Sequence, residues 1–208
     1  MLIHEEQSMK RYVAILIILV LCTLSTAVYA AGAKEFKDVS KTYWGRPFVD
    51  FAAEVGIISG YPIADGSLQF RPENPVSREE SMQMIYQTVK NSGLGHSPDQ
   101  TLSYKYEEQF IYNQIAPWAW ECVAYGLEYG ILEKSELASF RTDSGAPVPA
   151  TRELAARWTA KALNRPLLSA TSLNYIDKEQ IEADNIFYVD MLKRMSIMVG
   201  DNTGTFNP

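Results

Sequence analysis

The chain has 208 residues, a formal net charge of −6 and two histidines. No stripe of clustered Lys and Arg runs along it, which argues against a nucleic-acid partner, because binding to phosphates depends on such clusters. Of its two cysteines, Cys22 lies in the apolar leader, so Cys122 has no intrachain disulfide partner and an exported form must be stabilised by packing.

The first 30 residues have the pattern of a secretory signal peptide. Lys10 and Arg11 precede an apolar run from Tyr12 to Leu24, and small residues follow up to Ala30. The run is shorter than the roughly 20 apolar residues that a membrane span needs. We therefore expect a signal peptide at 1–30, cleavage after Ala30, and no membrane segment afterwards, with an uncleaved anchor as the alternative.

Residues 34–93 are predicted to form a helix, a loop and a second helix. Apolar residues at i, i+3, i+4 and i+7 predict the first helix and assign its stripe to the core: Phe48, Phe51, Ala52 and Val55. Gly56 stands where a left-handed residue would end that helix. Ser77 as N-cap and Glu80 at N3 form a capping box that predicts the start of the second helix.

A similar order recurs in residues 101–165. Trp118 precedes Gly130 by the same interval as Trp44 precedes Gly56. The second segment repeats the apolar stripe at matched positions: Cys122, Tyr125, Gly126 and Tyr129. It also offers Thr151 as N-cap of its second helix, with Glu153 in the first turn.

Residues 173–208 match the first half of the same pattern. The stripe of their predicted helix is Tyr188, Met191, Leu192 and Met195. Asp184 stands at the tryptophan position, and the chain reaches Pro208 before a second helix and its arginine. We expect this third repeat to be incomplete.

The ordered set of motifs resembles the S-layer homology family. The family pattern is Phe-x-Asp-Val, a tryptophan, Gly-Ile-Ile-x-Gly, an Asp-Gly turn, Phe-x-Pro and Thr-Arg-Ala-Glu. The first segment matches it at Phe36, Asp38, Val39, Trp44, Gly56, Gly60, Asp65, Gly66, Phe70, Pro72, Ser77, Arg78 and Glu80. The second matches at Trp118, Gly130, Phe140, Thr151 and Arg152, but it lacks the second glycine and the Asp-Gly turn.

The resemblance implies a mainly all-α fold with three helix-loop-helix repeats in a pseudo-threefold, three-pronged bundle whose third prong is incomplete. It also implies a secreted cell-surface protein that binds secondary cell-wall polysaccharide attached to peptidoglycan, often pyruvylated, in grooves between repeats. Carried over residue by residue, the ligand-binding residues would be Arg78, Arg152, Trp44 and Trp118. No metal and no cofactor are expected.

The residues themselves support such a site. Arg78 and Arg152 each follow an N-cap, where free N–H groups of the first turn favour an anion and a guanidinium can grip a carboxylate. The alternative for each is a surface arginine paired with a nearby glutamate. Trp44 and Trp118 offer flat apolar faces suited to sugar rings. Their alternative role is to anchor the first helix to the core.

Enzyme activity is not expected. His4 lies in the leader and His96 in a Gly/Ser/Pro-rich linker, which leaves no triad, and Cys122 falls on a predicted buried stripe. Two other functions stay open: a structural or protein-interaction module that pairs with other surface proteins or self-assembles, and a fragment of a larger S-layer protein or surface hydrolase.

Overall fold

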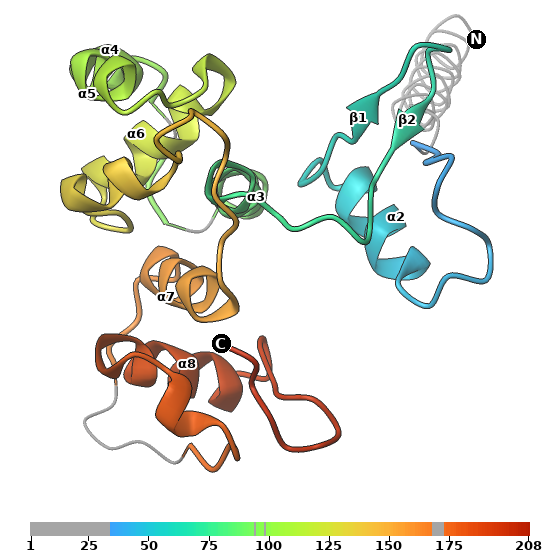
Figure 1. The fold of residues 1–208 in the computed structure, drawn as a ribbon, viewed down its shortest axis with the longest axis vertical. Coiled ribbons are helices and arrows are strands. Elements are labelled where there is room, and N and C mark those ends of the chain that lie inside the picture. The colour runs from blue at the N-terminus through green and yellow to red at the C-terminus, as the bar shows by residue number, and fades with distance from the viewer. Residues whose placement is uncertain (1–33, 94, 98, 168–172) are drawn as a thin grey trace, which may run out of the picture. The chain divides into compact units, whose positions relative to one another are not determined.

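The computed structural model describes residues 34–93, 95–97, 99–167 and 173–208, so the expected signal peptide lies outside the described residues. The described chain is mainly helical, as predicted (Figure 1). Its elements in chain order are α2 (Arg46–Glu54), β1 (Tyr61–Pro62), β2 (Leu68–Gln69), α3 (Arg78–Ser92), α4 (Leu102–Lys105), α5 (Glu107–Tyr112), η1 (Pro117–Ala119), α6 (Trp120–Glu128), η2 (Lys134–Ser139), α7 (Arg152–Ala162), η3 (Lys178–Gln180), η4 (Ala183–Asn185) and α8 (Ile186–Arg194).

The chain divides into two compact units. We call residues 34–54 and 59–70 the N-terminal unit, and residues 55–58 and 71–208 the C-terminal unit. Among the described residues, no helix is long and apolar enough to span a lipid bilayer.

The N-terminal unit consists of α2 and a short antiparallel hairpin in which Tyr61 pairs with Gln69. The predicted Asp-Gly turn closes this hairpin. Gly66 has φ +82°, a left-handed conformation that glycine adopts at little cost, and Asp65 Oδ1 accepts hydrogen bonds from the N–H and hydroxyl of Ser67. The turn therefore forms at the residues that the sequence indicated.

Asp38 joins the beginning of the N-terminal unit to its end. Its Oδ1 accepts a hydrogen bond from Phe70 N at 2.8 Å, and the rings of Phe36 and Phe70 lie 5.9 Å apart. The same arrangement recurs in the C-terminal unit, where Asp177 accepts hydrogen bonds from the N–H groups of Phe206 and Asn207. These aspartates therefore brace the Phe-x-Pro loop.

The prediction that the stripe of α2 is core is wrong for its two phenylalanines. Phe48 is 71% exposed and Phe51 is 62% exposed, whereas Val49 and Ala53 are the buried residues of the helix. The matched stripes of α6 and α8 pack against second helices that precede them in the chain, α3 and α7 respectively. The prediction is also wrong for Met195 at the end of the α8 stripe, which is 38% exposed. No second helix precedes α2 in the described residues.

The C-terminal unit begins its first long helix at the predicted signal. Ser77 Oγ accepts a hydrogen bond from Glu80 N at 3.2 Å, and Glu80 Oε2 accepts one from Ser77 N at 2.8 Å, which confirms the capping box at α3. Thr151 caps α7 through a bond from Leu154 N. The first helices also end as predicted, with Gly130 at φ +69° after α6.

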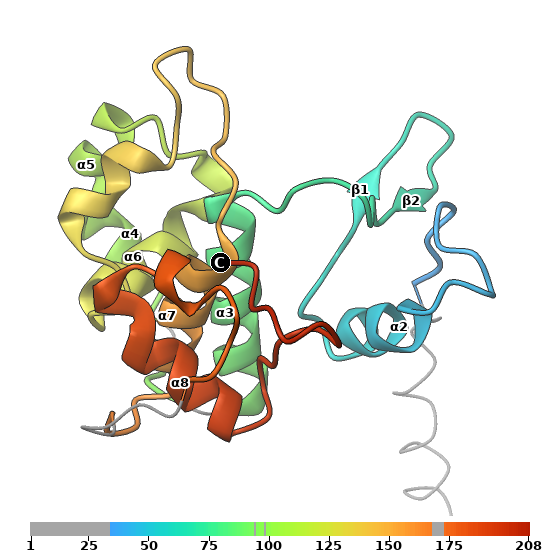
Figure 2. The same ribbon diagram turned by 60° about the horizontal axis from the view of Figure 1, so that its bottom comes forward.

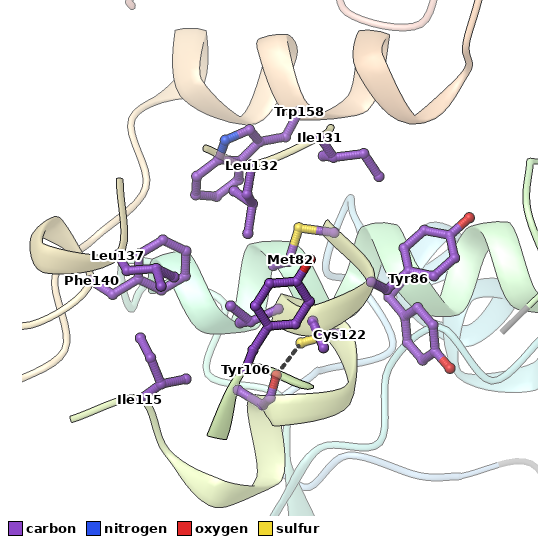
Figure 3. Close-up of a cluster of buried hydrophobic side chains, with 14 of the residues drawn as sticks. Met82, Tyr86, Tyr106, Ile115, Cys122, Ile131, Leu132, Leu137, Phe140 and Trp158 are labelled. Carbon is purple, nitrogen blue, oxygen red and sulfur yellow. Dashed lines mark hydrogen bonds between the residues drawn. The ribbon is translucent and has the colours of Figure 1, made fainter. Parts of the chain in front are cut away.

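Helix α3 lies beside α6 and α7 (Figure 2), and a large apolar cluster fills the space between these helices (Figure 3). The rings of Tyr86 on α3 and Tyr125 on α6 pack at a tilt of 59°, with their centroids 5.2 Å apart. Trp158 of α7 is fully buried and lies 5.7 Å from the ring of Phe140. This cluster is the core that makes the central helices of the C-terminal unit one packed body.

A second, smaller cluster joins α7 to α8. Ala156 and Ala160 of α7 are buried in the same cluster as Met191 and Leu192 of α8. Small side chains on one helix thus lie opposite large ones on the other, which lets the two helices pack closely.

The loop after α6 differs from its counterpart after α2. The sequence match pairs Phe140 with Phe70, but the residues before Phe140 form the 3-10 helix η2 instead of a hairpin. The turn comes later, where Arg141 pairs with Pro147 and Gly145 has φ +79°. The missing Asp-Gly turn in this segment explains why no hairpin precedes Phe140.

Candidate functional site

Arg152 is the more accessible of the two predicted arginines. It is the first residue of α7 and is exposed. Its Nη2 donates a hydrogen bond to the carbonyl oxygen of Val199 at 2.7 Å, and its guanidinium carbon lies 5.2 Å from the ring centroid of Phe206. A guanidinium has five N–H donors, so this geometry orients Arg152 and leaves donors that can meet a carboxylate.

Arg78 occupies the matched position at the start of α3 but lies deeper. Its Nη1 donates a hydrogen bond to Ser139 Oγ, just before Phe140. Burial lowers the pKa of Arg78, and the carboxylate of Glu136 opposes that effect. Its Nε is buried without a hydrogen-bond partner in the described part of the chain. A side chain held in this way is more constrained than Arg152.

The segments that lead into α3 and α7 pair with each other. Arg78 N donates to the carbonyl oxygen of Val148 at 2.9 Å, and Ala150 N donates to that of Val76 at 2.9 Å. This antiparallel bridge fixes the first turn of α3 beside the approach to α7. The backbone thus positions both arginines from one short paired segment.

A glutamate follows each arginine and ties its helix to the next segment of the chain. Glu79 is 1% exposed, and its Oε1 accepts a hydrogen bond from Ala116 N at 2.8 Å. Glu153 is 8% exposed, and its Oε2 accepts one from Glu182 N at 2.9 Å.

Sequence reasoning missed this linking role and gave Glu153 only a favourable place on the helix dipole. The matched Arg-Glu pairs were the available signal, because they repeat with the N-caps.

The two glutamates differ in their other partners. Both carboxylate oxygens of Glu79 accept from Arg141 Nη2, at 2.6 and 2.5 Å, in a largely buried ion pair. Glu153 also accepts from Asn185 Nδ2 at 3.1 Å. The start of α3 is therefore tied to the next segment through a glutamate with a charged partner, and the start of α7 through a glutamate whose described partners are neutral donors.

A second ion pair lies close to Arg78. Arg157 Nη2 donates to Glu136 Oε1, which also accepts from Trp158 Nε1 at 3.2 Å. Arg157 Nη1 donates to Asn185 Oδ1 at 3.3 Å. These contacts place the Arg78 guanidinium in a polar, largely buried network within the C-terminal unit.

Trp118 presents half of its surface to solvent. It is the middle residue of η1, directly after the Ala116 N–H that Glu79 binds, and it is 54% exposed. Its neighbour Trp120 turns inward, and its Nε1 donates to the carbonyl oxygen of Ile115 at 2.9 Å. The fold thus separates an inward tryptophan from one whose face can meet a ligand.

Trp44, in the N-terminal unit, is 78% exposed. Its ring packs edge-to-face on Phe48 with centroids 6.5 Å apart and lies 5.7 Å from the ring of Tyr43. Neither of these contacts buries it, so it does not anchor α2 to a core.

The remaining reactive groups have structural surroundings. Cys122 is fully buried, its thiol donates to the carbonyl oxygen of Ala119 at 3.0 Å, and burial raises its pKa, so it stays protonated. His96 stacks on Tyr129 with ring centroids 4.0 Å apart. The described residues include no group of three or more His, Cys, Asp or Glu placed to hold a metal ion.

Two surface hollows lie away from the predicted residues. One of about 190 Å³ lies beside α8 and is lined by Arg165, Pro166, Phe187, Asp190, Met191, Arg194 and Met195. Another, of about 520 Å³, lies in the N-terminal unit and is lined by Glu35, Phe36, Lys37, Val39, Ser40, Lys41, Arg46 and Ser67. Neither contains any of the four predicted ligand-binding residues.

Comparison with protein families gives one match. Residues 35–80 match the S-layer homology domain, from just before Phe36 to the capping box of α3. This segment belongs to the S-layer homology family. An S-layer homology domain is in general a non-catalytic cell-wall anchoring module, which indicates a protein associated with the cell wall or cell surface. No curated protein and no solved structure gives a significant match to the chain.

Proposed function

We propose that the protein is secreted and anchors to the cell envelope by binding a secondary cell-wall polysaccharide that is anionic and carries pyruvate ketals. The observation that carries this proposal is the matched placement of Arg78 and Arg152. Each is the first residue of a capped helix, and each reaches across to the following segment of the chain.

The two arginines would not contribute equally to polysaccharide binding. Arg152 is exposed and oriented by the Val199 carbonyl, so its free donors can bind a ketal carboxylate bidentately. Arg78 is largely enclosed, so its contribution would be to shape and charge the groove beside Trp118. Trp118, half-exposed, would stack on a sugar ring. Trp44 would supply a second stacking face in the N-terminal unit.

Within the same proposal, segments 34–93, 101–165 and 173–208 are three repeats of a pseudo-threefold bundle, the third partial. Three matched features support it. Left-handed residues follow each first helix, at Gly56, Gly130 and Ser196. Buried glutamates link each second helix to the next segment, and aspartates brace the loops at Phe70 and Phe206.

Calorimetric titration with soluble polysaccharide released from sacculi tests this function. We expect Arg152→Ala to weaken binding by at least about tenfold, because one bidentate charged contact contributes about 1.5–3 kcal/mol. Trp118→Ala should weaken it too. Arg165→Ala, which removes an arginine outside the proposed groove, is the control and should leave affinity unchanged.

Removing the ketals from the polymer should abolish the difference between wild type and Arg152→Ala. If Arg152→Ala and Arg165→Ala bind the intact polymer equally well, Arg152 is not the ligand-binding arginine. If the folded wild-type protein binds no polymer at all, the polysaccharide proposal is wrong and the protein-interaction alternative is favoured.

A further inference from the structure

The guanidinium of Arg78 is held by a neutral partner, although a carboxylate lies close by. In the described part of the chain, the partner of its side chain is the hydroxyl of Ser139. Ser139 and Glu136 are three residues apart in the 3-10 helix η2, where side chains at that spacing lie one above the other. The Ser139 hydroxyl also donates to the carbonyl oxygen of Glu136 at 2.5 Å. Glu136 therefore lies on the face of η2 that Arg78 contacts.

The carboxylate of Glu136 binds three other donors. Its Oε1 accepts from Arg157 Nη2 and from Trp158 Nε1, the latter at 3.2 Å, and its Oε2 accepts from Glu133 N at 2.8 Å. Of these donors only Arg157 is charged, and the side chains of Arg157 and Glu136 are 19% and 14% exposed. A charged donor in such an enclosed setting holds a carboxylate more strongly than neutral donors do. Arg157 is thus the strongest described partner of this carboxylate.

Arg157 is itself held from the opposite side. It lies one turn after Glu153 on α7, so the two side chains share a face of the helix, and both bind Asn185. Asn185 is 1% exposed, its Oδ1 accepts from Arg157 Nη1 at 3.3 Å, and its Nδ2 donates to Glu153 Oε2 at 3.1 Å. The matched residue of α3 is Gln83, so the first segment carries no equivalent arginine.

The charges of Glu136 and Arg157 both act on Arg78. Burial lowers the pKa of the Arg78 guanidinium, Glu136 raises it and Arg157 lowers it. Arg78 keeps part of its surface exposed. A carboxylate paired with Arg78 would cancel most of its attraction for an incoming anion, whereas the neutral hydroxyl of Ser139 leaves that attraction intact.

We propose that Arg157 is a positioning residue, which holds Glu136 and so keeps the positive charge of Arg78 available to the anionic polysaccharide. This inference rests on the proposed function, because that function gives Arg78 an anionic ligand. Without Arg157, the Glu136 carboxylate would pair with Arg78, and a charge that attracts the polymer would be cancelled. Arg157 itself would not touch the polymer, in contrast to Arg152.

Calorimetric titration of the full chain with soluble polysaccharide released from sacculi tests the inference. We expect Arg157→Gln to weaken binding about three- to tenfold, the effect of cancelling one unit charge near the ligand. Arg157→Lys, which keeps a cation for Glu136, should retain most of the affinity. Adding Glu136→Gln to Arg157→Gln should restore the affinity to within about twofold of the wild type, because no carboxylate then remains to pair with Arg78.

A second pair of variants places the carboxylate directly and leaves Arg157 unchanged. Ser139→Asp puts a carboxylate at the described partner of Arg78 and should weaken polymer binding to a similar extent. Ser139→Asn, which is neutral and of the same size, should not. This pair keeps the test decisive if Arg157→Gln does not fold, which urea unfolding would show.

Side-chain NMR of the Arg78 Nε–H gives a readout that needs no ligand. In the described part of the chain this buried nitrogen has no hydrogen-bond partner. We expect its resonance to shift in Arg157→Gln, as a carboxylate partner arrives, and to return toward its wild-type position when Glu136→Gln is added. Arg194→Gln is the matched control. It removes the cation bound to the 2% exposed side chain of Asp190 on α8, and should change neither the resonance nor the affinity.

The contrary results separate this inference from the function on which it rests. An unmoved Arg78 resonance in Arg157→Gln overturns the positioning role, whether or not the polymer binds. Affinity that stays low in the double variant also overturns it, because Arg157 would then contact the ligand itself. Equal affinity of Ser139→Asp and Ser139→Asn overturns the part assigned to the Arg78 charge. If the wild type binds no polymer while the resonance shifts as expected, the proposed function fails and the pairing of Glu136 with Arg157 in place of Arg78 is supported.

Discussion

Replacing Glu79 by glutamine should destabilise the C-terminal unit more than the matched change at Glu153. The Glu79 side chain is 2% exposed and binds both Arg141, at 2.5–2.6 Å, and the Ala116 N–H. The described partners of Glu153 are the Glu182 N–H and the Asn185 amide, neither of them charged. The two substitutions therefore differ chiefly in whether a buried cation loses its partner.

The geometry gives an estimate of each effect. Removing one partner of a buried ion pair costs about 3–5 kcal/mol, and because Arg141 keeps 15% of its side chain exposed we expect the lower end, about 3 kcal/mol. Glutamine at 153 keeps an oxygen that can accept from Glu182 N. The Glu153→Gln substitution should therefore lower the free energy of unfolding only by the difference between a charged and a neutral acceptor, about 1 kcal/mol.

Equilibrium urea unfolding, followed by tryptophan fluorescence, measures the difference. Trp158 is a suitable reporter because it is fully buried. Adding Arg141→Met to Glu79→Gln should recover part of the lost stability, since it removes the uncompensated guanidinium. A Glu79→Gln variant no less stable than Glu153→Gln would refute the reasoning.

Three further outcomes are expected. Phe140→Ala, at a fully buried ring, should cost about 3–5 kcal/mol in the same unfolding assay, whereas Phe48→Ala, at an exposed ring, should change stability by less than about 0.5 kcal/mol. Cys122 should resist a thiol reagent in the folded protein and react once urea unfolds it, because burial raises its pKa and blocks access. Hydrogen bonds from the Lys37 ammonium and from Ser67 lower the pKa of Asp65 from 3.8 to about 2. Because the pKa is lowered on folding, this contact stabilises the hairpin fully above pH 3.8, and the stabilisation is lost as pH falls toward 2. NMR chemical shifts of the turn should therefore change over this pH range in the wild type, and Asp65→Asn should remove that change.

Local signals predicted the helix starts well. Ser77 and Glu80 form the capping box that the sequence indicated, and Thr151 caps α7. Such motifs are predictable because donor and acceptor lie within one turn of each other. The burial of Cys122 on the α6 stripe was also predicted, and it is confirmed.

Properties that depend on a distant partner were not predictable in the same way. The spacing of Phe48 and Phe51 correctly gave an amphipathic helix, but burial requires a second helix against it, and periodicity does not say whether one is there. The ion pair of Glu79 with Arg141 joins residues far apart in the chain, so no local pattern indicated it.

The places of the two arginines on their helices were predicted, but their surroundings were not. Both arginines begin their helices as expected. Their different accessibility follows from what the next segment offers: η2 places Ser139 over Arg78, whereas the loop at Val199 leaves Arg152 exposed. Sequence similarity between the two segments could not reveal this difference, because it depends on the conformation of the loop rather than on the arginine.

The most direct test of the central claim is co-sedimentation of the full chain with cell-wall sacculi, before and after acid extraction of the secondary polysaccharide. Anchoring through that polymer predicts that the protein pellets with intact sacculi and stays in the supernatant with extracted ones. Equal pelleting with both preparations, or with neither by a folded protein, would contradict polysaccharide anchoring.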